Sequence, residues 1–198
     1  MMVFAKSPLP GKVKTRLAKG IGNKNATMIY KKMLYEHLKK ISSIPDVSIQ
    51  LWCYPDTRHP FFLRCARDFD MVLMRQSGAD LGRRMSYAFR QNAMHGSRIM
   101  ILSGTDIPGI EVHDIKMAIR HLKDKADVVL TPTLDGGYGL IAMKKSLPAV
   151  FTNMSWSTCW VLEQTLQRLK RLRLNVYLLQ HRRDIDDRQD YRLYLRES

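Results

Sequence analysis

The sequence predicts a single α/β domain with a mainly parallel central sheet covered by helices on both faces. Its 198 residues suit one well-packed core and would be cramped as two. Short apolar runs alternate with amphipathic segments from one end of the chain to the other, which is typical of α/β domains. Runs such as 99–102 are apolar on both faces, as expected for strands that helices cover on each side.

Seven apolar runs are candidate strands. They are Met2–Ala5, Val47–Tyr54, Met71–Met74, Ile99–Ser103, Asp127–Thr131, Gly139–Met143 and Asn175–Leu179. Four amphipathic segments between them are candidate helices: Ala26–Ile41, Leu81–Met94, Val112–Lys123 and Thr158–Leu172. Asp80 stands where an N-cap would open the second of these helices. In an open sheet of this kind, ligands bind outside the carboxyl ends of the strands, so the loops after strands are where chemistry is expected.

Composition excludes several classes of protein. With 45% hydrophobic and 26% charged residues the chain is predicted to be globular rather than disordered. No apolar run reaches the roughly 18–20 residues that cross a bilayer, and the first residues do not resemble a signal peptide. The three cysteines and six histidines show no zinc or redox spacing. We therefore expect a cytoplasmic protein without a membrane span or a zinc site.

The net charge of +15 is unusual and unevenly spread, with ten Lys or Arg against one acid between positions 6 and 40. A positive field attracts nucleic acid, anionic membrane surfaces or phosphorylated small molecules. Charge alone leaves these three partners open.

The stretch KSPLPGKVKTRLAKG follows the first predicted strand. Pro8 and Gly11 shape a loop, and Lys14 and Arg16 follow as the chain turns toward a helix. The stretch matches neither the Walker A loop nor GxGxxG. A lysine point charge and an arginine fork together suit phosphate groups. A solvated basic loop is the competing interpretation.

Two further strands are followed by acids. In ILSGTDIPGI a buried strand ends, Gly104 allows a ligand to approach the backbone, and Asp106 projects from the strand end. A carboxylate there suits Mg²⁺, which takes one or two protein carboxylates and fills its shell with phosphate oxygens and water. An aspartate that caps the next turn is the competing interpretation. In TPTLDGGYGLIAM, the run 135–137 fits either a hairpin turn or a backbone that passes close to a sugar or base. The segments SGADLGRRM and DIDD add an N-cap flanked by glycines and an acidic run.

Six ordered blocks of the chain resemble a widespread bacterial glycosyltransferase-like family of unassigned activity. That family is similar to the molybdopterin-guanylyltransferase and phospholactate-guanylyltransferase enzymes, which share the GT-A (nucleotide-diphospho-sugar transferase) fold. The blocks are Phe4-Ala5-Lys6-x-Pro8-x-Pro10-Gly11-x-x-Lys14-Thr15-Arg16-Leu17, Gly78-x-Asp80-Leu81-Gly82-x-Arg84-Met85, Gly104-Thr105-Asp106-x-Pro108, Asp135-Gly136-Gly137-Tyr138, Trp156-Ser157-Thr158 and Asp184-Ile185-Asp186. The resemblance covers nearly the whole chain and implies one GT-A-like domain over residues 1–198.

The resemblance also implies roles for individual residues. Lys14 and Arg16 match a basic pair at a nucleotide's phosphates, and Asp106 and Asp186 match a pair that holds Mg²⁺ or Mn²⁺. Asp135 resembles part of the sugar or acceptor pocket and is the one candidate for a general base. The remaining residues expected to contact the nucleotide are Lys6, Pro8, Gly11, Gly78, Asp80, Gly104, Gly136 and Gly137.

The predicted function is a metal-dependent transferase that uses a nucleotide-sugar or a nucleoside triphosphate, in the manner of a glycosyltransferase. A nucleotidyltransferase acting on a phosphorylated acceptor is the alternative, because both reactions expel a phosphate leaving group. A non-catalytic nucleotide- or nucleic-acid-binding protein is a third possibility that the charge suggests. Against nucleic acid, the basic residues are not interleaved with aromatic ones.

Overall fold

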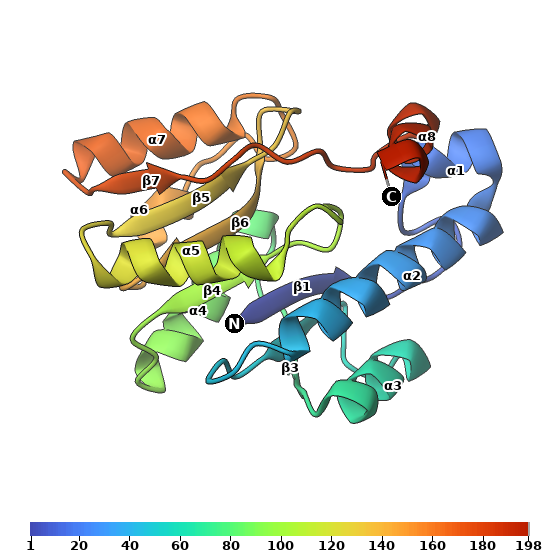
Figure 1. Ribbon diagram of the computed structural model, residues 1–198, viewed down its shortest axis with the longest axis horizontal. Helices are drawn as coiled ribbons and strands as arrows, with labels where there is room; N and C mark the ends of the chain where they lie inside the picture. The colour runs from blue at the N-terminus through green and yellow to red at the C-terminus, as the bar shows by residue number, and fades with distance from the viewer. Residues whose placement is uncertain (198) are drawn as a thin grey trace.

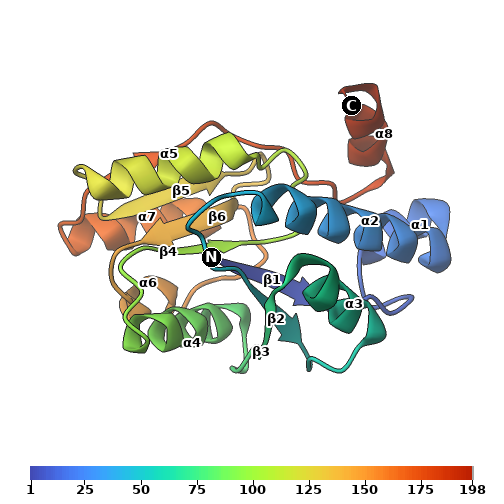
Figure 2. The ribbon, with the colours of Figure 1, turned by 60° about the horizontal axis from the view of Figure 1, so that its bottom comes forward.

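The computed structural model, which describes residues 1–197, forms one seven-stranded sheet with helices on both faces (Figures 1 and 2). The strand order is β3-β2-β1-β4-β6-β5-β7. The strands are β1 (Met2–Lys6), β2 (Gln50–Tyr54), β3 (Val72–Arg75), β4 (Met100–Ser103), β5 (Val128–Pro132), β6 (Tyr138–Met143) and β7 (Val176–Leu178). Only β6 runs antiparallel to its neighbours, β4 and β5. The predicted mainly parallel α/β fold is therefore confirmed.

The helices form two layers and one outlying pair. They are α1 (Thr15–Ile21), α2 (Asn23–Ser42), α3 (Pro60–Phe69), α4 (Leu81–Met94), α5 (Val112–Lys123), α6 (Pro148–Phe151), α7 (Val161–Arg171) and α8 (Arg188–Glu197). Helices α2, α3 and α5 cover one face of the sheet, and α4, α6 and α7 cover the other (Figure 2). Helices α1 and α8 lie side by side at one end of the molecule (Figure 1).

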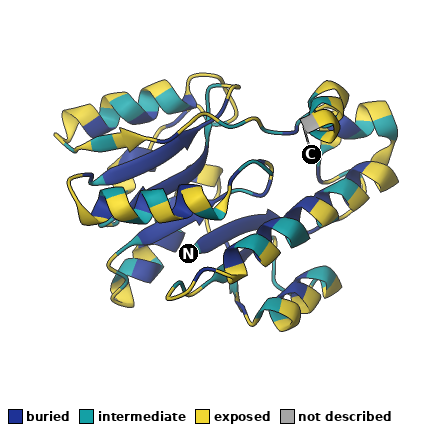
Figure 3. Ribbon diagram, in the orientation of Figure 1, coloured by how far each residue is buried: buried dark blue, intermediate teal, exposed yellow. Residues whose placement is uncertain are grey.

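Alternation along each strand produces two cores, one on each face. In β1, Val3 and Ala5 pack toward α2, while Met2 and Phe4 pack into the core beneath α4. All four side chains are buried, as Figure 3 shows for the central strands. Successive side chains of a strand point to opposite faces, so a strand that is apolar throughout must be covered on both.

The expected elements are present with some changes in their bounds. Strand β2 begins at Gln50 rather than Val47, and α3, α6 and α8 form where no helix was predicted. Helix α7 begins at Val161, three residues later than expected. Thr158 does not cap it, because its Oγ1 donates to the carbonyl oxygen of Ser155 at 2.7 Å within the preceding turn. Asp80 does cap α4, accepting from the Arg83 N–H at 2.8 Å.

The strand order reverses between β1 and β4, which lie side by side and parallel at the centre of the sheet. The connections that leave their carboxyl ends diverge, and this opens a crevice where ligands bind in such sheets. The loop after β1 carries Lys14, and the loop after β4 carries Asp106. Within residues 1–197 no helix is both long and apolar enough to cross a membrane.

Candidate active site

Lys14 is the centre of an ion-pair cluster at this crevice. It is the N-cap residue of α1, and its backbone adopts the left-handed conformation with φ 48°. Its ammonium lies 2.7 Å from Asp106 Oδ1 and 3.9 Å from Asp186 Oδ1. It also donates to the carbonyl oxygen of Ile185 at 2.6 Å. The Lys14 side chain is only 3% exposed, so this lysine is not a solvated surface charge.

Arg16 extends the cluster toward solvent. Its guanidinium donates to Asp186 Oδ2 at 2.9 Å, and its side chain is 69% exposed. Asp106 is also open, with 54% of its side chain exposed. The sequence predicted separate roles for the two basic residues, at phosphate, and for the two acids, at a metal. In the structure the two pairs contact each other. Lys14 bridges both acids from the buried side, while Arg16 and Asp106 face outward.

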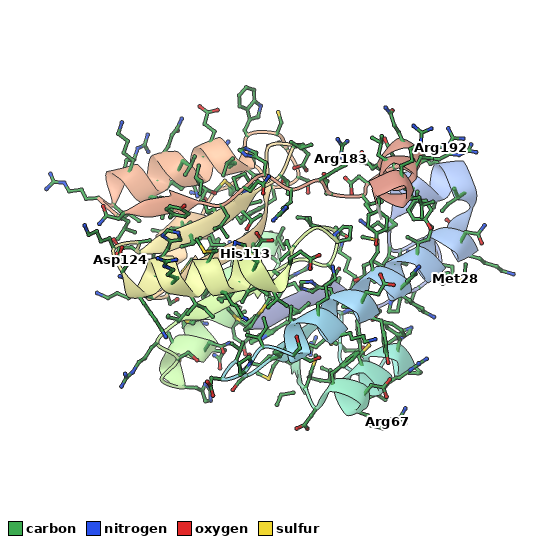
Figure 4. All side chains as sticks on the ribbon, in the orientation of Figure 1. Met28, Arg67, His113, Asp124, Arg183 and Arg192 are labelled. Atoms are coloured by element: carbon green, nitrogen blue, oxygen red, sulfur yellow. The ribbon has the colours of Figure 1, made fainter. Side chains whose placement is uncertain are left out.

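Residues 179–187, which we call the C-terminal strap, bring Asp186 to the crevice. The strap crosses from β7 to α8 in Figure 1. Backbone N–H groups of the strap donate to the carbonyl oxygens of Leu130, Pro132 and Asp106, each at 2.8–3.0 Å. Arg183 lies on the strap and Arg192 on the helix that follows it (Figure 4). The chain thus returns across the strand ends before it packs beside α1.

A buried ion pair fixes the strap from below. The Arg182 guanidinium donates to both carboxylate oxygens of Asp114, at 2.8 and 3.0 Å. Asp114 is only 4% exposed and also accepts the Glu111 N–H at the start of α5. Both hydrogen bonds come from one nitrogen, Nη2, and these charge-assisted contacts tie the strap to the first turn of α5.

Four carboxylates share this edge of the sheet. Burial raises the pKa of Asp186; Lys14 opposes that rise and Asp106 adds to it. Burial, followed by the charges of Asp135 and Asp186, raises the pKa of Asp184 to about 6. Part of each rise comes from the neighbouring carboxylates, and negative charges that lie this close to one another favour a bound cation. Sequence reasoning gave Asp184 no role, although its position in the DIDD run marked it.

Two buried polar residues of α2 support the strand ends beneath the site. The Tyr30 hydroxyl accepts the Lys6 N–H at 2.9 Å and donates to the Lys6 carbonyl at 3.2 Å. Burial, and then the charge of Asp106, raise the pKa of Tyr30. His37 Nε2 lies 2.9 Å from the hydroxyl of Ser103, the last residue of β4. Helix α2 thereby fixes the carboxyl ends of β1 and β4 relative to each other.

The segment 133–137 is the hairpin turn between β5 and β6, as one of the two interpretations predicted. Asp135 Oδ1 accepts from the Thr133 hydroxyl at 2.5 Å and from the Gly137 N–H at 3.0 Å. Gly136 has φ +85°, and a Cβ there would lie 2.1 Å from the Cys159 carbonyl oxygen. The close approach at Gly136 is therefore to the protein's own chain. Asp135 is exposed and faces the carboxylates of the strap.

Gly78 and Asp80 line a different part of this edge, a cavity of about 490 Å³ beside α4. Gly78 has φ +140°, and a Cβ there would lie 2.7 Å from the Arg84 nitrogen. Among the described residues, the cavity lining does not include Lys14 or Asp106.

The other predicted contacts are spread over two loops. Lys6 is exposed, Pro8 is buried, and Gly11 faces the Asn23 side chain. Gly104 donates its N–H to the carbonyl oxygen of Gly139, and open space lies where its Cβ would be. Of these positions, Gly104 adjoins Asp106 and leaves room for a ligand.

The donor set suits a hard divalent cation. Asp106 and Asp186 each have a carboxylate oxygen within 3.9 Å of the Lys14 ammonium, so the two acids lie close together. Residues 1–197 contain no cluster of three His, Cys, Asp or Glu that would hold a metal by themselves. Mg²⁺ does not need one, since it keeps waters and takes phosphate oxygens beside one or two carboxylates. The residues fit a metal that arrives together with a nucleotide.

Comparison with solved structures identifies the same architecture elsewhere. A protein from Desulfovibrio desulfuricans G20, provisionally assigned as a nucleotide-diphospho-sugar transferase, is 30% identical with a TM-score of 0.91, over 99% of this chain and 85% of that one. The 4-diphosphocytidyl-2C-methyl-D-erythritol synthase of Anaerococcus prevotii DSM 20548 is 12% identical with a TM-score of 0.64, over 99% and 98% of the two chains. The glucosyl-3-phosphoglycerate synthase of Mycobacterium tuberculosis, in complex with Mn²⁺, uridine diphosphate and glucosyl-3-phosphoglycerate, is 10% identical with a TM-score of 0.58, over 96% and 72%. No curated protein matches the chain.

Fold and comparisons together define the class: this protein is a transferase with the nucleotide-diphospho-sugar transferase fold. The model of the bacterial family described as "uncharacterized protein conserved in bacteria (DUF2064)" matches residues 37–158. That stretch is more than half of the chain, and the chain belongs to this family.

Proposed function

We propose that this protein is a divalent-metal-dependent transferase that takes its donor from a nucleotide-sugar, in the manner of a glycosyltransferase. The observation that carries the proposal is the buried Lys14 ammonium between Asp106 and Asp186 at the switch point of the sheet. A buried lysine beside two partly exposed carboxylates provides a fixed positive charge for a diphosphate and oxygens for Mg²⁺ or Mn²⁺. We call Lys14, Asp106 and Asp186 the clamp. The Mn²⁺ and uridine diphosphate bound to the mycobacterial synthase of the same fold agree with this use.

The two basic residues would divide the work by exposure. Lys14, held at the base of the crevice, would contact the leaving phosphate, while the exposed Arg16 would exchange its bond to Asp186 for an outer phosphate oxygen. Asp106 and Asp186 would hold the metal, which neutralises charge on the phosphate oxygens when bound. Preorganised charges at the point where negative charge develops stabilise the transition state more than the ground state.

The transfer itself is simple in its balance. An acceptor hydroxyl oxygen bonds to the anomeric carbon, and the carbon–oxygen bond to the nucleoside diphosphate breaks. The diphosphate leaves with the electron pair, and the hydroxyl proton passes to a base. Asp135 is the base candidate: the hairpin holds its Oδ1, and its exposed carboxylate is near enough to Asp184 and Asp186 for its charge to raise their pKa.

Nucleotidyl transfer is the second candidate, because several solved structures of this fold are cytidylyltransferases, including one complexed with CTP. In that reaction a phosphate acceptor attacks the α-phosphorus and pyrophosphate leaves. The same clamp serves both reactions, and the released product separates them.

The test is thermal denaturation of the protein and of Asp106→Asn with nucleoside diphosphates, triphosphates, and UDP- and GDP-sugars, with and without Mg²⁺ or Mn²⁺. We expect one nucleotide class to raise the midpoint only when metal is present, because only the native state holds the clamp. Asp106→Asn should fold normally and lose that shift, and a matched exposed change, Asp46→Asn, should keep it. A parent protein that no nucleotide stabilises with metal present would refute the proposal.

A further inference from the structure

A cavity beside α4 has no part in the function proposed above. It measures about 490 Å³, within the usual range for small-molecule sites, and it lies away from the Lys14 cluster. Its lining includes Ser77 and Gly78, which follow β3 at the same sheet edge as the crevice. A second cavity of about 470 Å³ shares Ser77, Gly78 and Tyr87 with it, so the hollow continues along this edge.

The walls of the cavity are closely packed and braced. A Cβ on Gly82 of α4 would lie 2.5 Å from the Phe151 carbonyl oxygen and 2.6 Å from Trp156 Nε1. The opposite wall, residues 152–156, is held by Arg168, whose guanidinium donates to the carbonyl oxygens of Val150, Thr152 and Asn153. Helix α4 and this wall are therefore in close contact, and because both are held in place we infer that the cavity is preformed.

The charged groups along the cavity wall are mainly positive, and both arginines among them are exposed. Arg83 and Arg90 both line it, and Asp80 is the one acid among its lining residues. Asp80 is already engaged: its Oδ1 caps α4, and its Oδ2 lies 3.5 Å from Arg83. Within residues 1–197 no carboxylate forms an ion pair with Arg90. Its guanidinium carbon instead lies 5.8 Å from the centre of the Tyr87 ring.

Aromatic and polar groups complete the lining. Tyr87 is held by an edge-on contact with the buried Trp52, with ring centres 6.0 Å apart, and Trp156 lines the cavity from the far wall. Ser86, Thr152 and Asn153 add small hydrogen-bonding groups. Flat aromatic faces beside hydroxyl and amide groups suit a sugar or polyol, and an unpaired guanidinium suits a phosphate monoester.

We propose that this cavity binds the acceptor of the transfer, and that the acceptor is a small phosphorylated sugar or polyol whose phosphate lies against Arg90. The assignment of the ligand as an acceptor rests on the proposed function. The phosphate would take the Arg90 fork and the outer face of Arg83. The hydroxyl-bearing part would lie between Tyr87 and Trp156, and the donor would approach from the side of Gly78, which lies at the sheet edge that also holds the crevice.

The test is calorimetric titration with glucose 6-phosphate, glycerol 3-phosphate, inorganic phosphate, glucose and glucuronate. The variants are Arg90→Met, Arg90→Lys and the control Arg98→Met, which removes an equal charge from an exposed position just before β4. We expect a phosphorylated probe to bind at least tenfold more tightly than glucose. Arg90→Met should weaken it tenfold or more, Arg90→Lys should weaken it less, and Arg98→Met should stay within twofold.

The outcomes separate this inference from the proposed function. Nucleotide-dependent stabilisation that survives in Arg90→Met, together with lost binding of the phosphorylated probe, supports two distinct subsites. If nucleotides fail to bind the parent but a phosphorylated probe still binds through Arg90, the cavity remains a phosphate-sugar site and the transferase proposal falls. Equal losses in Arg90→Met and Arg98→Met, no binding of any phosphorylated probe, or equal binding of glucuronate would each overturn the inference.

Discussion

Replacing Lys14 by methionine keeps the length of the side chain and removes its charge, which isolates the role of the ammonium. Lys14 makes contacts of 2.6 Å and 2.7 Å with the Ile185 carbonyl and Asp106, and one of 3.9 Å with Asp186. A hydrogen bond to a charged group contributes about 1.5–3 kcal/mol. If Lys14 meets a phosphate at such geometry, Lys14→Met should weaken nucleotide binding by roughly 10- to 150-fold, since about 1.4 kcal/mol corresponds to a factor of ten.

Binding of metal alone should change in the opposite direction. In the parent protein the ammonium neutralises Asp106 and Asp186, and it is the largest influence that lowers the pKa of Asp186. Without it, the two carboxylates should bind Mn²⁺ more tightly. A solvated basic loop predicts neither the size of the nucleotide loss nor the opposite sign for the metal.

The assay is isothermal titration of nucleotide and of Mn²⁺ at about 50 and 200 mM salt, over which exposed charges become strongly screened. The control is Lys32→Met, which removes a lysine that is 70% exposed and pairs only with Glu36, at 3.8 Å. It should change affinity by less than about twofold, because exposed pairs contribute roughly 0–1 kcal/mol. Equal losses from the two variants that vanish at high salt would mean that a diffuse field, and no clamp, attracts the nucleotide.

Two further predictions concern the support beneath the site. Burial lowers the pKa of His37 from 6.5 to about 4, so between these values the unfolded chain binds the proton and the folded one does not. The free energy of unfolding should therefore fall by about 2–3 kcal/mol between pH 7 and 4.5 because of this group. Urea unfolding of His37→Gln should show a fall with pH that is smaller by that amount, and equal falls in the parent and the variant would contradict the prediction. Arg182→Met should lower the melting midpoint by roughly 5–10 °C, because it leaves the buried Asp114 without its ion-pair partner, and it should weaken metal–nucleotide binding by releasing the strap. The neighbouring Arg183→Met should have neither effect. Similar effects from the two variants would contradict the role given to the strap.

Most of the fold could be predicted from the sequence, because the strands and longer helices follow from the local spacing of apolar residues. Alternating apolar runs placed all seven strands, and the bounds of α4 and α5 agree with the prediction to the residue. Asp80 was recognisable as a cap because the hydrogen bond that it makes spans only three residues. Helices α3 and α8 were missed since their apolar residues pack as short patches against α2 and α1, and a short patch gives no extended period.

The site depended on contacts between residues distant in the sequence, and these only the tertiary structure decided. The sequence predicted that four residues belong to the site: Lys14, Arg16, Asp106 and Asp186. It assigned the two basic residues to phosphate and the two acids to a metal, and it did not predict that they contact one another. Position 14 and position 186 meet because the strap returns across the strand ends, held by Arg182 and by the bond from Ile185 to Asp106. The cavity of Arg90 and Trp156 likewise forms only where α4 packs against the segment after α6. Local sequence fixes which residues can be charged or apolar, whereas the packing of distant segments fixes which charges meet in one crevice and act together.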